Sequence, residues 1–338
     1  MISFQRLKAA AQTLGIPIIG TLEAMDMPVP ERSLASKLKK GAISGFEPPL
    51  ELVGKPEKVM PGVKSIIVIG LPYELFPGPA ADPLAVCEVS AMAWGYDYHD
   101  RVKEKLAGLA SWLRDHDSGE TMVFCDTGPL NDRYLAFLAG LGTYGRNQLL
   151  IHERWGSAVV YGYLLTKATL ESTGRLDAAP YSECGSCRLC QEACPSGALQ
   201  GDYEFATTRC ISNLTQQKRA LTEKEMDWMG TSLYGCDICQ RVCPKNKKRE
   251  ESRLLKSATP NRLNPFELFS LNKRGFQERF HHHGFAWRGL KTLQRNALIN
   301  LYNSGNVQLL ATLAVWEREG KMPAQLCELS RILETEKL

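Results

Sequence analysis

The chain has 338 residues, 44% of them hydrophobic and 23% charged, which is the balance of a globular protein and excludes a disordered chain. No apolar run approaches the roughly 18 residues of a membrane span, and the first residues lack the apolar core of a signal peptide. The net charge is only +4. From the lack of a membrane span and a signal peptide we expect a cytoplasmic protein whose thiols stay reduced.

The first part of the chain alternates between apolar runs and loops. Apolar residues at helical spacing predict a helix over 3–14, and I-P-I-I-G after it predicts a strand. The run 64–73 predicts a buried strand. Residues 26–62 are rich in Pro and Gly, which predicts a long surface loop, and a second loop runs to about residue 86.

The next part mixes helices and strands. It predicts a helix from Asp100 to Arg114, a strand from Thr121 to Asp126 and a helix over 132–141. Q-L-L-I-H and A-V-V-Y-G-Y-L-L-T predict two strands paired with each other across a turn at 154–157. Because no regular β-α-β order is present, the expected fold class is α+β and not doubly wound.

Eight cysteines stand in and between two runs, C-G-S-C-R-L-C-Q-E-A-C-P and C-D-I-C-Q-R-V-C-P. Three thiolates at C-x-x-C-x-x-C can hold three irons of one 4Fe–4S cluster, and the cysteine before proline ligates the other cluster. The predicted ligands of the first cluster are Cys184, Cys187, Cys190 and Cys243, and those of the second are Cys194, Cys210, Cys236 and Cys239.

Two other uses of these cysteines are less consistent with the pattern. Zinc sites need four ligands for each ion and show no crossing cysteine–proline signature. A disulfide framework is unexpected in a long chain without a signal peptide. We interpret the remaining cysteines, Cys87, Cys125 and Cys327, as structural.

The cysteine runs divide the chain into three predicted domains, 1–177, 178–248 and 249–338. Beyond about residue 260 only helical signals appear, and the segment beginning W-R-G-L-K predicts a paired-helix unit of the HEAT type.

A basic block extends from Lys245 to Arg295, with 13 Lys or Arg against four Asp or Glu. It indicates either a polyanionic partner or a solvated helical surface. Arg288, Lys291 and Arg295 are expected at i, i+3 and i+7 on one helix face, where they could contact a phosphate backbone. We interpret His281–His283 as polar surface in the same block.

Two clusters form a path for electrons, and the preceding residues contain candidates for chemistry at its end. Asp126 at a strand end is a candidate proton donor, since a carboxyl that faces a pocket can have a raised pKa. Asp97 and His99 lie in Y-D-Y-H. The alternatives are that Asp126 caps the following turn and that His99 is a solvated ring in the first turn of a helix.

The string G-L-G-T-Y-G at 140–145 follows a predicted helix and not a strand, so it fails as a dinucleotide fingerprint. We interpret it as a backbone turn that lets a large flat ligand approach closely.

Over roughly residues 3–300 the sequence resembles the epoxyqueuosine reductase family. C-D-T-G-P-L-N-D-R-Y-L-A-F-L-A-G-L-G-T-Y-G-R-N is similar to that family's D-T/S-x-x-x-x-D/E-R…A-G-x-G-x-x-G-K-N segment, and D-Y-H-x-x-x-x-x-K-L to its upstream motif. R-C-I-S-N-L-T-Q and L-Y-G-C-D-I-C-Q-R-V-C-P-K-N resemble its second cysteine motif. The combination is specific, because a ferredoxin motif alone would not bring the Asp126 segment with it.

The resemblance implies an oxidoreductase that reduces epoxyqueuosine to queuosine in the tRNA anticodon loop, the last step of that modification. It implies a nitroreductase-like cobalamin-binding domain, a ferredoxin-like domain with two 4Fe–4S clusters and a short HEAT-like end. Electrons from an external donor such as flavodoxin or ferredoxin would pass through the clusters to cobalamin. A monomer is expected.

Site residues are carried over on the matching motifs. Asp126 matches the catalytic acid, and Asp97 and His99 match residues of the substrate pocket. The residues implied to lie along the corrin are Arg133, Gly142, Gly145, Arg146 and Asn147. In two departures, Arg146 stands where Lys is usual and Thr143 where a bulkier residue is frequent. The alternative functions are a corrinoid-dependent reductase of a small molecule, similar to reductive dehalogenases, and a non-catalytic electron-transfer protein.

Overall fold

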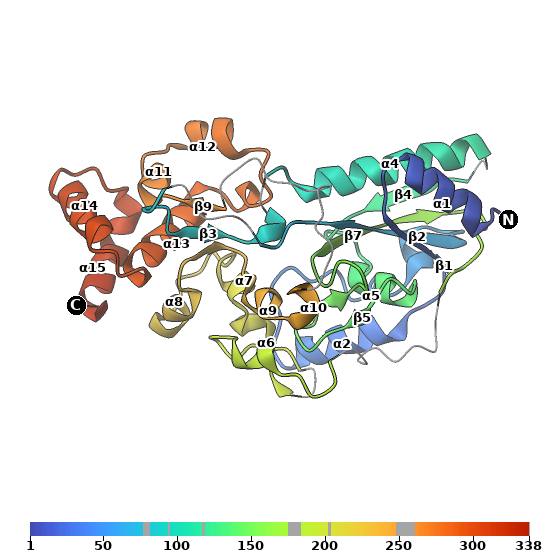
Figure 1. Cartoon of the computed structure of the whole chain (residues 1–338), viewed down its shortest axis with the longest axis horizontal. Coiled ribbons are helices and arrows are strands. Elements are labelled where there is room, and N and C mark those ends of the chain that lie inside the picture. Colours follow the sequence, from blue (N-terminus) through green and yellow to red (C-terminus); the bar gives the residue numbers. More distant parts are fainter. Residues whose placement is uncertain are drawn as a thin grey trace.

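The computed structural model describes residues 1–76, 82–93, 95–116, 119–174, 184–201, 204–247 and 261–337. The fold is α+β, as the sequence predicts. An antiparallel sheet covered by helices forms the N-terminal part, helices dominate the C-terminal end, and the cysteine-bearing segments lie between them (Figure 1). Among the described residues, no helix is both long and apolar enough to cross a membrane.

The main sheet has the strand order β1-β2-β7-β4, and each neighbouring pair is antiparallel. Its strands are β1 (Ile18–Glu23), β2 (Ser65–Pro72), β7 (Val159–Thr166) and β4 (Thr121–Phe124). Every residue of the central strands β2 and β7 is buried. Such strands are apolar throughout because both faces of the sheet are covered.

Helices cover both faces of this sheet (Figure 1). The covering helices are α1 (Phe4–Thr13), α4 (Tyr98–His116) and α5 (Asp132–Leu138). Ile67 and Ile69 of β2 belong to the apolar cluster that includes α1 and α4, whereas Ile66 and Val68 belong to the cluster that includes α5. The alternation of side chains along one strand therefore divides the core between two layers.

A smaller sheet joins the three predicted domains. In it β3 (Cys87–Val89) pairs in parallel with β8 (Ser232–Tyr234) and antiparallel with β9 (Arg262–Leu263). Each strand comes from a different predicted domain, so the chain segments interlock. The predicted boundaries at 177/178 and 248/249 lie outside the described residues and stay a prediction.

Residues 26–62 are not one long loop, which corrects the sequence prediction. Two helices, α2 (Pro28–Lys39) and α3 (Pro56–Val59), lie there, and both have proline in the first turn. Proline favours a helix start because its fixed φ suits the helix and its missing N–H would have had no partner. The same prolines that suggest a loop in the sequence therefore mark helix starts in the structure.

The predicted hairpin around 154–157 is also wrong. β6 (Leu150–Ile151) pairs with β5 (Thr143–Tyr144) in a two-stranded sheet, whereas β7 pairs with β2 and β4. A single bridge between His152 and Gly156 lies at the expected turn. Because β7 is almost entirely apolar and is buried along its whole length, it occupies the centre of the main sheet with a partner on each side, and no edge is left for β6.

Short helices carry the cysteine region, and longer ones form the C-terminal end. The first group is α6 (Leu189–Glu192), α7 (Ile211–Leu214), α8 (Glu223–Met229), α9 (Ile238–Arg241) and α10 (Pro244–Lys247). The second is α11 (Pro265–Phe269), α12 (Lys273–Phe280), α13 (Leu290–Asn303), α14 (Val307–Arg318) and α15 (Cys327–Lys337). α13 and α14 form the expected HEAT-like pair, and α13 also packs on β8 and α8.

The contact between β7 and α4 allows a test of core packing. A Cβ at Gly162 would clash with Val102 Cγ1 and lie 2.9 Å from Phe124 O. Overpacking of this kind costs roughly 1–3 kcal/mol, so Gly162→Ala should lower the thermal unfolding midpoint measured by circular dichroism. Gly201→Ala is the matched control, because its Cβ would meet nothing within 4 Å. Equal midpoints for the two variants would contradict the described packing.

Candidate active site and cluster-binding region

Four side chains converge at the end of β4, where Asp97, Tyr98 and His99 meet Asp126. The Tyr98 hydroxyl donates to Asp126 Oδ2. His99 Nε2 lies 3.5 Å from the same oxygen, and His99 Nδ1 lies 2.6 Å from Asp97 Oδ1. The structure thus brings together the three residues selected from the sequence. It adds Tyr98, which sequence reasoning missed although it stands within Y-D-Y-H.

The backbone of Asp126 is held in an uncommon conformation. Its φ is 55°, and the N–H of Thr127 donates to Cys125 O at 2.6 Å, which makes Asp126 the centre of a three-residue turn. Such a conformation needs support from its surroundings. The buried side chain of Asp132 supplies it, because Asp132 Oδ2 accepts the Asp126 N–H at 2.8 Å. Burial, and then the charge of Asp126, raises the pKa of Asp132 to about 7.

Hydrogen bonds set the protonation states of this site. Partial burial alone would raise the pKa of Asp126, but the bonds from His99 and Tyr98 hold it below its usual value. This corrects the expectation of a raised pKa. Burial would lower the pKa of His99, yet Asp126 and Asp97 raise it to about 9. At neutral pH an ionised Asp126 therefore faces a doubly protonated His99.

Asn131, and not Asp126, caps the following helix. Asn131 is the N-cap residue of α5, and its Oδ1 accepts the Tyr134 N–H at 2.9 Å. Within the described residues, the Asp126 carboxylate has Tyr98 and His99 as its hydrogen-bonding neighbours, and its side chain is 51% exposed. The His99 ring, only 23% exposed, is not simply solvated. Asp126 is therefore not a turn cap, and His99 is not a solvated ring, so both alternatives from the sequence are wrong. The exposed part of the Asp126 carboxylate can face a bound molecule.

The C-terminal segment forms one side of this site. The Asp97 N–H donates to His282 O at 2.6 Å, and a Cβ at Gly284 would lie 3.6 Å from Asp97 Oδ1. His281 and His282 are exposed, as expected for polar surface, whereas His283 is half-buried. The histidine run therefore lies against the site, a contact between distant segments that no local pattern indicates.

The glycines of the predicted cofactor segment are explained by packing within the chain. A Cβ at Gly142 would lie 2.6 Å from Ile151 O, and a Cβ at Gly145 would lie 2.8 Å from Ile151 Cδ1. Both therefore permit the close approach of β5 and β6. Arg133 Nη1 donates to Gln148 O at 3.1 Å, which ties α5 to the same segment.

Three buried polar atoms in and beside this segment have no hydrogen-bond partner in the part of the chain that the structure describes. They are Thr143 Oγ1, Asn147 Nδ2 and Tyr161 OH. Buried polar atoms are nearly always paired, and an exception calls for an explanation such as a bound ligand. These atoms could therefore hold a polar cofactor beside β5 and β7.

The seven cysteines of the two runs and Cys210 between them are all half-buried and gather in two sets of neighbours. Burial, and then the surrounding thiols, raises the pKa of Cys190 to about 11, and the same causes raise that of Cys236 to about 12. The thiols acting on Cys190 are Cys184, Cys243 and Cys187, and those acting on Cys236 are Cys210 and Cys194. Cys239 has both Cys236 and Cys190 as neighbours, so the sets adjoin. Four thiols in each set are the donors that a 4Fe–4S cluster needs.

Buried hydrogen bonds fix the second cysteine run to the main sheet. Gln240 Nε2 donates to Tyr73 OH and to Ser157 O, each at 2.9 Å. Asn246 Oδ1 accepts the Ser157 N–H at 2.7 Å, and Asn246 Nδ2 donates to Gln240 O at 2.7 Å. All four residues are buried. We call Tyr73, Ser157, Gln240 and Asn246 the polar interlock.

Arg146 fixes the first cysteine run. Its backbone N–H donates to Cys184 Sγ at 3.4 Å, and its Nη2 donates to Gly185 O at 2.9 Å. The predicted cofactor segment thus touches a predicted cluster ligand directly. Arginine in place of lysine has an evident use here, because its guanidinium reaches the cysteine loop.

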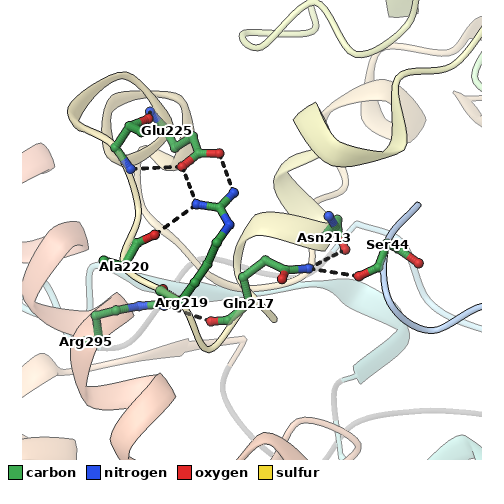
Figure 2. Close-up of polar contacts among 8 residues, drawn as sticks. Ser44, Asn213, Gln217, Arg219, Ala220, Glu225 and Arg295 are labelled. Atoms are coloured by element: carbon green, nitrogen blue, oxygen red, sulfur yellow. Dashed lines mark hydrogen bonds and ion pairs between the residues drawn. The ribbon is translucent and has the colours of Figure 1, made fainter. Parts of the chain in front are cut away.

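The basic residues chosen for RNA contact do not share a helix face. Arg288 lies before α13, in a 3-10 turn (Ala286–Arg288), and Gly289 with φ 80° separates it from the helix. Arg295 is turned inward, and its Nη1 donates to Gln217 O at 2.7 Å and Arg219 O at 2.9 Å (Figure 2). Lys291 is exposed. The predicted set was wrong in its geometry because periodicity cannot reveal where a helix begins or which partners its side chains meet.

The raised pKa of His99 is open to direct measurement. A histidine-selective ¹⁵N NMR titration of the oxidised protein, assigned with His99→Gln, should show the ring doubly protonated at pH 7 and losing its proton near pH 9. The folded pKa exceeds the unfolded value of about 6.5, so the stability from this ring is present below that pH and is lost as the pH rises through about 9. Asp126→Asn should lower the midpoint. A neutral His99 ring at pH 7 would disprove the charge assignment.

Comparisons with known proteins agree with this arrangement. A family model described as "4Fe-4S double cluster binding domain" matches residues 183–246. A second, described as "Epoxyqueuosine reductase QueG, DUF1730", matches residues 54–127. The cysteine region is therefore an iron–sulfur domain of the double-cluster type.

Whole-length relatives extend the match. The epoxyqueuosine reductase of Bacillus subtilis (strain 168) is 33% identical over an alignment that covers 97% of this chain and 90% of the relative. The structure of epoxyqueuosine reductase from Streptococcus thermophilus superposes with a TM-score of 0.85 at 30% identity, over 94% of this chain and 86% of that one. A crystal structure of an epoxyqueuosine reductase with an epoxyqueuosine-modified tRNA-Tyr stem loop has a TM-score of 0.83 at 32% identity, over 91% and 83%. This chain belongs to the epoxyqueuosine reductase family.

Proposed function

We propose that this oxidoreductase reduces epoxyqueuosine to queuosine in the anticodon loop of tRNA, the final step of queuosine formation, with cobalamin and two 4Fe–4S clusters. The single observation that carries the proposal is the Asp97–Tyr98–His99–Asp126 group at the end of β4. It combines a proton store with an exposed carboxylate. The relative crystallised with a modified tRNA stem loop supports the substrate.

The residues beside β5 fit a large polar cofactor. Thr143 Oγ1, Asn147 Nδ2 and Tyr161 OH are buried without a partner among the described residues, and Arg133 and the 142–147 segment lie beside them. We propose that these groups hold the amide-rich edge of a corrin. When bound, cobalamin would supply the low-potential metal chemistry that opens the epoxide.

The protein's own contribution is a proton delivered at Asp126 Oδ2. Removing an epoxide oxygen as water takes two electrons and two protons. Asp126 is ionised at neutral pH because its pKa is low, so it must be loaded before it can act as an acid. His99 Nε2, 3.5 Å away, holds a proton for it. As the departing oxygen becomes basic, one proton passes from His99 through Asp126 to it, and solvent supplies the second. Tyr98 and Asp97 keep His99 and Asp126 oriented for this relay.

The electron path enters through the two cysteine sets. We propose Cys184, Cys187, Cys190 and Cys243 as ligands of one cluster and Cys194, Cys210, Cys236 and Cys239 as ligands of the other. Arg146 links the proposed ligand Cys184 directly to the cofactor segment. An external one-electron donor such as flavodoxin or ferredoxin would reduce the clusters. We propose that the enzyme acts as a monomer in the cytoplasm, where its tRNA substrate is.

Asp126→Asn tests the acid. The variant keeps the size of the side chain but removes the transferable proton, so turnover of an epoxyqueuosine-containing stem loop should fall roughly a hundredfold or more. Binding of cobalamin, followed by its absorption spectrum, and binding of the stem loop should stay close to wild type. Asp100→Asn is the matched control, since Asp100 is exposed in the first turn of α4, which also carries Tyr98 and His99. Normal turnover of Asp126→Asn would remove Asp126 from the mechanism.

Metal analysis tests the clusters. Anaerobically purified protein should contain about eight irons and eight sulfides per chain, as two 4Fe–4S clusters require. Cys210→Ser should damage one cluster only, whereas Cys327→Ser, a change of a cysteine outside both sets, should leave the iron content unchanged. Close to four irons in intact wild-type protein would rule out the assignment of two clusters.

A further inference from the structure

We propose that Phe46, Trp287 and Arg288 form a stacking platform for an unpaired nucleobase of the anticodon loop, next to the nucleotide that enters the active site. The inference rests on the proposed function, since it takes tRNA as the substrate. It assigns a role to Phe46 and Trp287, which the sequence analysis did not select, and a stacking role to Arg288, which was expected only as a phosphate contact. We refer to these three residues as the aromatic platform.

The platform presents flat surfaces to solvent. Trp287 is 55% exposed and Phe46 is 48% exposed, although large aromatic side chains are usually mostly buried. The two rings meet edge to face, with centroids 5.8 Å apart. Arg288 Cζ lies 4.6 Å from the centroid of Trp287 and 5.6 Å from that of Phe46. Two π faces and a guanidinium plane are thus gathered in one place.

Both halves of the platform are held in position. Trp287 Nε1 donates to Tyr234 OH at 2.8 Å. On the other side, Glu47 Oε2 accepts the N–H groups of Gly45 at 2.8 Å and Phe46 at 3.1 Å. The rings are therefore preorganised, which lowers the entropy that a ligand must overcome on binding.

A chain of polar contacts connects the Phe46 loop to α13 (Figure 2). Gln217 Nε2 donates to Ser44 O at 3.1 Å and to Asn213 Oδ1 at 2.9 Å, and Gln217 O accepts from Arg295 Nη1 at 2.7 Å. Arg295 forms one end of this series of contacts, and it lies on α13, the helix that follows Arg288. Its inward orientation, which removed it from the predicted RNA contacts, thus serves to align the two segments of the platform.

The platform lies close to the catalytic group. The segment that carries Trp287 begins at His282, whose carbonyl accepts the Asp97 N–H at 2.6 Å. Tyr234, which anchors Trp287, belongs to β8 of the small sheet. Burial, and then the nearby charges of Asp97 and Asp126, raise the pKa of the Tyr234 hydroxyl to about 12. A nucleotide adjacent to one bound at Asp126 would therefore be within reach of the platform.

The chemistry favours an RNA base over other occupants. Single-stranded bases are bound by stacking on aromatic rings and on guanidinium planes. Among the described residues no carboxylate pairs with Arg288, and Lys291 nearby is exposed. Arg288 and Lys291 therefore place positive charge beside the rings. This charge would attract a phosphate backbone and repel a basic protein surface.

A double-mutant cycle tests the platform. Binding of an anticodon stem loop to the intact enzyme is measured by fluorescence anisotropy, with and without an abasic residue in place of each nucleotide that flanks the modified one. Trp287→Ala should weaken binding roughly tenfold, in the range seen when base-stacking aromatics are removed. One abasic substitution should weaken wild type by a similar factor but should weaken Trp287→Ala little further. Arg288→Gln should reduce the salt slope by about one.

Tryptophan fluorescence supplies the matched control. Stem-loop binding should quench Trp287, so the quenching should be lost in Trp287→Phe and retained in Trp112→Phe. Trp112, on α4, also has a stacked partner, His116 at 4.3 Å between centroids. Additive effects of Trp287→Ala and the abasic residues would overturn the proposal. So would unchanged RNA affinity of Trp287→Ala with a raised KM for reduced flavodoxin, which would make the platform a protein-docking surface.

The outcomes separate the platform from the proposed function. Wild-type enzyme that shows the coupling but leaves epoxyqueuosine unreduced would retain the platform and refute the activity. Enzyme that reduces epoxyqueuosine while Trp287→Ala binds the stem loop as tightly as wild type would refute the platform alone.

Discussion

The arrangement of this protein depends on the polar interlock of Tyr73, Ser157, Gln240 and Asn246. A buried polar network is stable only when each donor and acceptor has a partner, so it permits very few docking geometries. Here the second cysteine run meets the ends of β2 and β7 in one such geometry. A Cβ at Gly156 would clash with Asn246 Oδ1, which shows how closely the two segments approach.

This docking gives the clusters a defined position relative to the catalytic group. The interlock holds the second run, and Arg146 holds the first run. The small sheet of β3, β8 and β9 joins the segment before the second run to the C-terminal helices. Electron transfer requires cofactors at fixed separations, and proton transfer requires groups within hydrogen-bonding reach. The contacts among the three chain segments hold the cysteine sets and the end of β4 in one arrangement.

In the candidate active site, two neighbouring groups have different protonation states because their environments differ. Asp126 receives hydrogen bonds from His99 and Tyr98, which lower its pKa, whereas the two carboxylates around His99 raise the pKa of that ring to about 9. Asp126 is thus ionised at neutral pH, whereas the neighbouring His99 is protonated. Asp132 stabilises this arrangement, because its side chain accepts the Asp126 N–H and so holds the backbone of Asp126 at its positive φ.

The sequence by itself determined the features that depend on local spacing. The cysteine intervals predicted iron–sulfur ligation, the apolar run of β2 predicted a central strand, and the Asp126 segment indicated the family. Tertiary structure alone decided which distant residues meet: Tyr98 with Asp126, His282 with Asp97, Phe46 with Trp287, and Arg295 with Gln217. Periodicity and motif spacing report on neighbours along the chain, whereas these contacts arise when separate segments pack, and there burial and hydrogen bonding set each side chain's direction and charge.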